Sequence, residues 1–162
     1  MAAIRGYCPA GGCVLALCCD ARVCTPDTRI GLNEVELGIP VPLYWARLMA
    51  SLVGAGRADK LLQTAAMVPA QEAVSLGLVD AAVPTAELLA AAQAELARRL
   101  AFPDSGRVAT KRALRAPMAE AWHAYTEEEA QGGWVGLSQP RVVQALAGVM
   151  ARLSKAQPAP KL

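Results

Sequence analysis

The segments of this 162-residue chain that favour β-strand are few and lie mostly in its first third. Short apolar runs at residues 2–7, 22–25 and 29–32 favour buried strands, and residues 78–83 alternate like a half-buried strand. From Leu43 onward most other segments have helical spacing. Because isolated strands are unstable, these segments are too few to build a complete sheet. We therefore expect an α/β chain that forms the later part of a larger domain or borrows sheet edges from elsewhere.

The expected helices alternate with short connections over the rest of the chain. We place them at residues 13–19, 45–52, 58–65, 70–76, 85–101, 105–115, 118–132 and 138–153. Gly77 is expected to end one helix, and Thr85 to cap the N-terminus of the next. This pattern predicts a core at residues 1–101, a helical region at 102–154 that forms a lid or oligomer contacts, and a flexible tail at 155–162.

Composition excludes several classes of protein. The net charge is +2, and the 16 Lys and Arg residues are spread along the chain without a basic run, so no nucleic-acid partner is expected. No stretch reaches the roughly 20 apolar residues that a membrane-spanning helix needs. The apolar start runs directly into Arg5 without the layout of a signal peptide. We expect a soluble protein with one sizeable core.

All five cysteines lie in the first 24 residues, at Cys8, Cys13, Cys18, Cys19 and Cys24. Zinc sites favour Cys-x-x-Cys pairs with a second pair of ligands further on, and the one histidine, His123, lies far downstream. We therefore expect buried free thiols, a reducing compartment and no metal site.

Three motifs resemble the crotonase superfamily in the right order. Residues 3–22 (AIRGYCPAGGCVLALCCDAR) resemble its oxyanion-hole segment, residues 30–39 (IGLNEVELGI) its second catalytic segment, and residues 70–84 its AxxAxxxGLVxxVVP signature. Within the superfamily the first two segments look most like the mitochondrial 3,2-trans-enoyl-CoA isomerases. The resemblance implies a truncated ClpP/crotonase-like fold that lacks the early β-α repeats, much of the CoA-binding surface and one of two oxyanion-hole amides.

Two residues match the family's catalytic positions. The resemblance makes the backbone amide of Gly11 an oxyanion-hole donor, and it makes Glu34 the carboxylate that moves a proton between C2 and C4 of the acyl chain. The apolar neighbours of Glu34 fit a carboxyl group whose pKa is raised by burial. Without the resemblance, Glu34 reads more readily as a solvated glutamate, and Gly11 as a glycine needed for helix packing. Glu36 competes with Glu34 by position, but the motif selects Glu34.

The residue at position 14 distinguishes two activities. Hydratases of this superfamily carry there a second glutamate that activates water, and this chain has Val14. Valine holds no water, so the resemblance favours an isomerase over an enoyl-CoA hydratase. Pro9, Ala10 and Val14 are expected to line the substrate pocket. No metal or cofactor is implied, because CoA enters as part of the substrate.

Other polar and aromatic residues have simpler interpretations. Asp20 is expected to be structural and to bond backbone amides, and His123 to lie on a surface helix without a catalytic role. Trp45, Trp122 and Trp134 are most simply packing residues, although the resemblance lets Trp122 or Trp134 line the acyl pocket or a subunit contact.

The resemblance leaves other functions open. A chain without the first half of the family's fold fits a non-catalytic partner of full-length relatives, or a product that does not fold stably alone. Family members commonly form trimers, so a homo-oligomer is expected. A mitochondrial matrix location is implied, while the C-terminal Pro160-Lys161-Leu162 differs from a peroxisomal Ser-Lys-Leu signal only at its first residue. A cytosolic location follows if no transit peptide is present.

Overall fold

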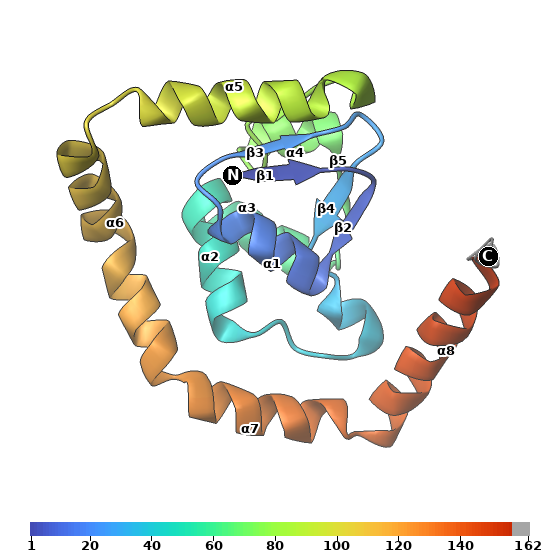
Figure 1. Cartoon of the computed structure of the whole chain (residues 1–162). Coiled ribbons are helices and arrows are strands. Elements are labelled where there is room, and N and C mark those ends of the chain that lie inside the picture. The colour runs from blue at the N-terminus through green and yellow to red at the C-terminus, as the bar shows by residue number, and fades with distance from the viewer. Residues whose placement is uncertain (157–162) are drawn as a thin grey trace, which may run out of the picture.

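The computed structural model describes residues 1–156 and shows two small sheets surrounded by helices (Figure 1). The first sheet has the order β1 (Ala2–Ile4), β3 (Arg22–Cys24), β6 (Ala81–Ala82), with parallel pairs. The second has the order β2 (Tyr7–Pro9), β4 (Arg29–Gly31), β5 (Val68–Pro69), in which β2 and β4 are parallel and β4 and β5 antiparallel. The strand segments therefore pair with one another within the chain.

The first expected strand is divided between the two sheets. Residues 2–7 do not run as one strand, because Gly6 has φ of 69° and bends the chain after Arg5. A glycine adopts this left-handed conformation at little steric cost. The carbonyl of Gly6 accepts a hydrogen bond from the amide of Arg29 at 3.2 Å, which ties the bend to the start of β4. One glycine thus sends β1 to one sheet and β2 to the other.

Four helices pack around these sheets: α1 (Ala10–Cys18), α2 (Leu43–Val53), α3 (Ala55–Gln63) and α4 (Ala70–Leu76). The core joins Leu17 of α1, Ile30 and Leu32 of the β4 segment and Met49 of α2, each at most 2% exposed. The helix expected at 13–19 begins three residues earlier and is not buried all round, since Leu15 is 73% exposed.

The cysteines bear out the expectation of free thiols but not that of general burial. All five are free, and only Cys13 and Cys24 are buried, while Cys18 is exposed. Burial raises the pKa of the Cys13 thiol to about 12, so this group stays protonated at neutral pH.

The segment after α4 forms less strand than expected. Gly77 ends α4 in the left-handed conformation, as predicted. The amides of Leu78 and Val79 then donate to the carbonyl of Ala73, so these two residues complete the end of the helix and only Ala81 and Ala82 remain for β6.

The next helix also differs from its prediction. Thr85 does not cap it but lies in a 3-10 turn, η2 (Thr85–Glu87), and α5 (Leu88–Leu100) follows without a side-chain cap. Leu88 and Ala92 are buried, whereas Leu96 and Leu100 on the same stripe are 43% and 57% exposed. The apolar face of α5 is thus covered over its first half only.

The last three helices form an arc that runs down one side of the core, passes below it and rises on the other side (Figure 1). They are α6 (Asp104–Ala124), α7 (Thr126–Leu137) and α8 (Pro140–Ala156). The break expected between residues 115 and 118 is absent, because α6 continues through Pro117 and the chain turns at Tyr125 instead. Proline inside a helix costs about 3 kcal/mol, which packing elsewhere along α6 has to offset.

None of the helices in residues 1–156 combines the length and hydropathy that crossing a bilayer requires. The expected tail begins inside α8, and residues 157–162 lie outside the described part of the chain.

Candidate active site

Glu34 opens a short 3-10 helix, η1 (Glu34–Leu37), three residues after β4. Gly38 ends this turn with φ of 73°, and its amide donates to the carbonyl of Val35 at 3.0 Å. The amide of Ile39 donates to the carbonyl of Glu34 at 3.2 Å. Because these bonds close the turn on both sides of Gly38, the backbone of Glu34 is fixed relative to the core.

The carboxyl group of Glu34 is buried without a partner. The residue is 7% exposed, and neither carboxylate oxygen has a hydrogen-bond partner among the described residues. Loss of hydration on burial raises the pKa of Glu34 above its ordinary value. A shift in this direction brings the carboxyl closer to the pKa at which a group both accepts and returns protons readily.

Glu36 has a different environment from Glu34. It is exposed, and its Oε2 accepts a hydrogen bond from the side-chain amide of Asn33 at 3.3 Å. The two glutamates lie two residues apart, and only Glu34 is removed from water.

A cavity of about 610 Å³ lies against Glu34. One wall comes from residues 33–45 and the opposite wall from α7 and α8. The residues that line it are Ala10, Asn33, Glu34, Leu37, Ile39, Pro40, Val41, Pro42, Leu43, Trp45, Tyr125, Glu128, Glu129, Gly132, Gly133, Gly136, Leu137 and Leu146. Helix α8 packs against η1 and buries Val142, which closes the cavity beside Glu34. The space suits a largely apolar chain next to one protonatable group.

The N-terminus of α1 reaches the same cavity through Ala10. This residue has φ of 50°, a left-handed conformation that costs about 1 kcal/mol or more for a residue with a side chain. Gly11 follows it in the first turn of α1, where amides have no acceptor within the helix. A Cβ on Gly11 would lie 3.8 Å from the Trp45 ring, which is ordinary contact, so packing alone does not demand glycine there.

The other residues expected in the pocket lie further away. Pro9 and Val14 are not among the residues that line the cavity, and Val14 is 6% exposed in the core-facing side of α1. Of the expected site residues, the cavity therefore brings together Glu34 and Ala10, with Gly11 adjacent in sequence.

Sequence reasoning expected residues 102–154 to form a lid or oligomer contacts but did not single out the residues at the start of this wall that line the cavity. Tyr125, Glu128 and Glu129 line the cavity, and Glu129 accepts a hydrogen bond from Trp122 Nε1 at 2.9 Å. Trp122 stacks on the buried Tyr44, with ring centroids 5.9 Å apart. Little in the local sequence marks these residues, because the folding of the arc against α2 brings them to the cavity. The run of three glutamates at 127–129 is the one available signal.

The remaining aromatic residues and His123 have simple positions. Trp45 lines the cavity, Trp134 is 74% exposed on α7, and neither Trp122 nor Trp134 belongs to the cavity lining. His123 is exposed on α6, where it was expected.

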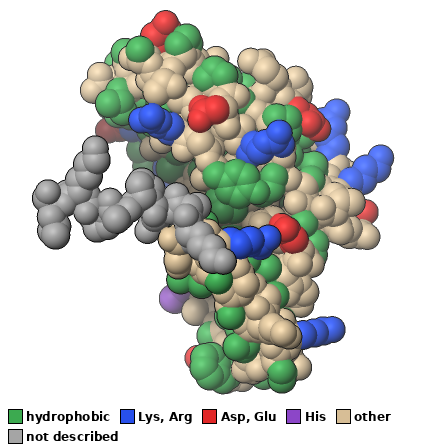
Figure 2. All heavy atoms as spheres, turned by 90° about the vertical axis from the view of Figure 1, so that its right-hand side faces the viewer, with side chains coloured by type: hydrophobic (Ala, Val, Ile, Leu, Met, Phe, Trp, Pro, Cys, Tyr) green, Lys and Arg blue, Asp and Glu red, His purple; other side chains and the backbone are tan. Residues whose placement is uncertain are grey.

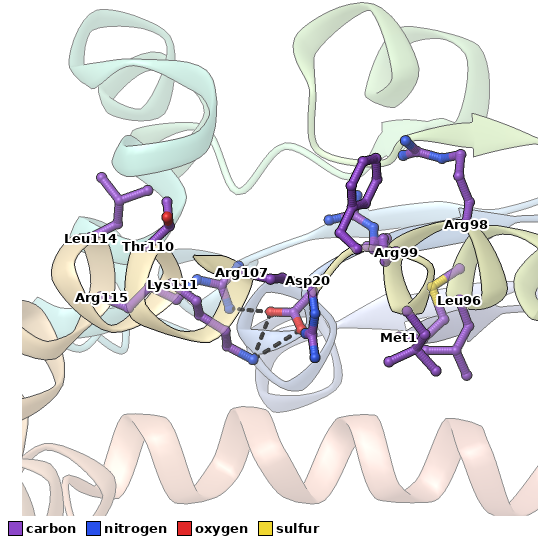
Figure 3. A pocket seen from close by; sticks show the side chains of 13 residues that line it. Met1, Asp20, Leu96, Arg98, Arg99, Arg107, Thr110, Lys111, Leu114 and Arg115 are labelled. Carbon is purple, nitrogen blue, oxygen red and sulfur yellow. Dashed lines mark hydrogen bonds and ion pairs between the residues drawn. The ribbon is translucent and has the colours of Figure 1, made fainter. Parts of the chain in front are cut away.

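Asp20 does not bond backbone amides as predicted. Its carboxylate lies 2.9 Å from Lys111 Nζ and 2.9 Å from Arg115 NH1 of α6 (Figure 3). These two cations lower the pKa of Asp20, the hydrogen bond from Lys111 contributing most. The backbone-amide role belongs instead to Asp80, whose Oδ2 accepts from the Arg22 amide at 2.7 Å. The pocket around Asp20 is a separate one of about 370 Å³ and does not contain Glu34.

In the part of the chain that the structure describes, no three His, Cys, Asp or Glu side chains gather as metal ligands would.

Residues 1–133 match the enoyl-CoA hydratase/isomerase family, which is well over half of the chain. The chain belongs to this family. The match includes Glu34, the N-terminus of α1 and most of the residues that line the cavity, while three lining residues of α7 and α8 lie beyond it.

Comparisons with individual proteins agree. Human mitochondrial enoyl-CoA delta isomerase 1 is 32% identical over 157 residues, which cover 96% of this chain and 52% of the human protein. A crotonyl-CoA hydratase of Syntrophomonas wolfei is 42% identical over 89 residues, 55% of this chain and 34% of that protein. The crystal structure of human mitochondrial delta3-delta2-enoyl-CoA isomerase superposes with a TM-score of 0.87 at 32% identity, over 94% of this chain and 60% of that one.

These matches confirm the expected crotonase fold. The chain spans about half the length of the curated isomerases that it matches. The comparisons include both isomerases and hydratases and therefore do not choose between the two activities.

Proposed function

We propose that this crotonase-family chain carries the proton-transfer site of an enoyl-CoA delta isomerase. Glu34 takes a proton from C2 of a 3-enoyl-CoA and returns it at C4, so that the double bond moves from C3–C4 to C2–C3. The observation that carries the proposal is the buried, unpartnered carboxyl group of Glu34 at the wall of a largely apolar cavity. Its raised pKa suits a group that accepts and donates the same proton in one cycle.

The thioester oxygen gains negative charge when the C2 proton leaves. The amide of Gly11, in the first turn of α1, is our candidate donor to that oxygen, with the dipole of the helix behind it. The substrate class is an acyl-CoA, and CoA takes part only as the carrier of the acyl chain. No metal or redox group has a step in this reaction.

Position 14 supports isomerisation over hydration. Val14 is a buried apolar residue, and adding water across a double bond needs a second group that holds and activates the water. Val14 does not line the cavity, so the hydratase alternative would have to draw that group from residues that do.

Conversion of 3-enoyl-CoA to 2-trans-enoyl-CoA, followed at the absorbance of the conjugated thioester, tests the proposal. We expect turnover by the purified chain and a loss of about 10²- to 10⁴-fold in Glu34→Gln. Glu36→Gln is the matched control, since that carboxylate is exposed and bonded to Asn33. Equal activity of Glu34→Gln and wild type would refute the proposal, and loss of absorbance from added 2-enoyl-CoA would indicate a hydratase.

Exposed apolar side chains favour a second candidate, a chain that associates with copies of itself or with full-length relatives. Leu114, Trp134 and Met150 are 77%, 74% and 64% exposed along the arc. Hydrophobic side chains also reach the surface on the face shown in Figure 2. We propose a homo-oligomer, and a trimer from the family resemblance. A monomeric mass in solution at micromolar concentration would contradict this.

We also propose a mitochondrial matrix location in fatty-acid β-oxidation. Its support is the mitochondrial designation of the human and mouse relatives. The competing peroxisomal signal at residues 160–162 lies outside the described residues. Imaging of the protein with a fluorescent tag placed first at one end and then at the other distinguishes the two compartments and the cytosol.

A further inference from the structure

Glu129 is a second glutamate on the cavity that holds Glu34, and the proposed proton transfer does not use it. It projects from α7, on the wall opposite η1. Its Oε2 accepts the indole N–H of Trp122 at 2.9 Å. The Trp122 ring lies almost parallel to that of Tyr44, at an interplanar angle of 8°, and Tyr44 is 6% exposed in α2. The core thus fixes the orientation of this carboxylate through one stacked ring.

The other oxygen of Glu129 has no donor. Oε1 is buried and has no hydrogen-bond partner among the residues that the structure describes. Burying a carboxylate oxygen without a donor costs more than burying a neutral polar atom, and most such groups in folded proteins have a partner. Because Oε2 accepts from Trp122, the carboxylate is held in one orientation, and Oε1 needs a donor of its own.

We propose that Glu129 Oε1 accepts a hydrogen bond from an N–H or O–H group of the ligand bound in the cavity. This assignment rests on the proposed binding of an enoyl-CoA, and it makes Glu129 a specificity residue at a distinct point of the same cavity. An ionised carboxylate only accepts hydrogen bonds, so a purely apolar segment placed there leaves Oε1 without a donor.

Two parts of an acyl-CoA supply such donors. A hydroxyl group on the acyl chain is one source, and the amides and hydroxyl of the pantetheine arm are the other. A hydrogen bond to a charged acceptor changes binding by about ten- to a hundredfold. Either source gives Glu129 the same chemistry, and matched ligands separate them.

The test measures binding rather than turnover, so it does not depend on catalysis. Calorimetric titration compares octanoyl-CoA with a series of hydroxyoctanoyl-CoA positional isomers, on wild type and on Glu129→Gln. In the variant, an amide that keeps its oxygen on Trp122 turns its NH2 group to the place of Oε1, and that group accepts no hydrogen bond. We expect Glu129→Gln to weaken binding about ten- to a hundredfold. A loss confined to one or more hydroxylated ligands assigns the donor to the acyl chain, and an equal loss for all ligands assigns it to the pantetheine arm.

Glu127→Gln is the matched control. Glu127 lies two residues away on α7, is exposed, lies outside the cavity lining and already accepts from Gln131 at 2.8 Å. The Glu127→Gln variant should bind every ligand with the affinity of wild type. If Glu129→Gln fails to fold, Glu129→Asp keeps the charge but withdraws the carboxylate by one methylene, and the same loss is expected.

Three results would overturn the inference. Unchanged binding of all ligands by a folded Glu129→Gln refutes it and leaves the proposed function intact. An equal loss of affinity in Glu127→Gln would mean that the effect comes from removing a negative charge from α7 and not from the position of Glu129. Wild type that binds no acyl-CoA at all refutes this inference and the proposed function together.

Discussion

The core at residues 1–101 and the helical arc beyond it are held in place differently. Among the described residues, Val142 is the only buried hydrophobic side chain after residue 92. Within the core, apolar side chains from both sheets and four helices form one cluster. The arc contacts the core mainly through ion pairs and hydrogen bonds of Lys111 and Arg115 with residues 18–20, through aromatic contacts on Tyr44, and through α8 on η1. The core holds Glu34, while the arc supplies the second wall of its cavity.

The largest expected effect on stability comes from a substitution in the core, at Gly31. A Cβ there would lie 2.2 Å from the carbonyl oxygen of Ala66, so either β4 or the backbone before β5 has to move. We expect Gly31→Ala to lower the free energy of unfolding by about 3 kcal/mol or more and to displace Glu34, three residues on.

A glycine-to-alanine substitution in the arc should have the opposite effect on stability. Gly106 lies within α6 and a Cβ there meets nothing within 4 Å, so Gly106→Ala should stabilise by about 0.5–1 kcal/mol. Urea denaturation of both variants measures the contrast, and a Gly31→Ala protein as stable as wild type would show that β4 and β5 are not held as closely as described.

Removing the aromatic contact between the regions should loosen the arc and spare the core. Trp122→Ala deletes the stack on Tyr44 and the donor to Glu129, with an expected cost of about 2 kcal/mol. Hydrogen exchange should then become faster in α7 and α8 but not in β3 or α1. Trp122→Phe retains the ring and should keep most of the protection. Uniform loss of protection across both regions would mean that the arc and core unfold as one unit.

The core and the arc also differ in how much of each can be predicted from the sequence alone. The resemblance singled out Glu34 and Gly11 because the motifs that carry it are short segments whose residues are close in sequence, and the structure places Glu34 at the cavity. Gly77 was identifiable as a helix end for the same reason. Glu129 was not, because its place in the cavity depends on where a helix about 95 residues from η1 packs. The division of residues 2–7 depends on the left-handed conformation of Gly6, which the apolar run did not reveal, and the helix through Pro117 departs from the local preference of proline.

The pH dependence of the free energy of unfolding tests whether the carboxyl group of Glu34 is buried in the core. The folded-state pKa of Glu34 is raised above its ordinary value of 4.5 by burial. Its contribution is therefore fully present below pH 4.5 and is lost as pH rises through the folded-state pKa. We expect wild type to lose stability relative to Glu34→Gln over that rise. Thermal unfolding of both proteins from pH 4 to 8 measures this difference, and parallel curves would place Glu34 in water.

The smallest effect should come from the ion pairs between Asp20 and α6. The side chain of Asp20 is 31% exposed, so Asp20→Asn should cost no more than about 1 kcal/mol in low salt and less in 1 M salt. The pKa of Asp20 is lowered, so its contribution is present at neutral pH and is lost as pH falls below its ordinary 3.8. A cost independent of salt would mean that these pairs act by packing rather than by charge.

The pairing of β3 with β6 has a consequence for synthesis of the chain. Val23 pairs with Ala81, so the first sheet cannot be completed until residue 82 has left the ribosome. The second sheet waits in the same way for Val68 to reach Ile30. The cavity is finished later still, when Glu129 and Leu146 emerge. Glu34 is thus made well before the residues that enclose it, and a nascent chain of this kind exposes its apolar cavity wall to chaperones or partners during that interval.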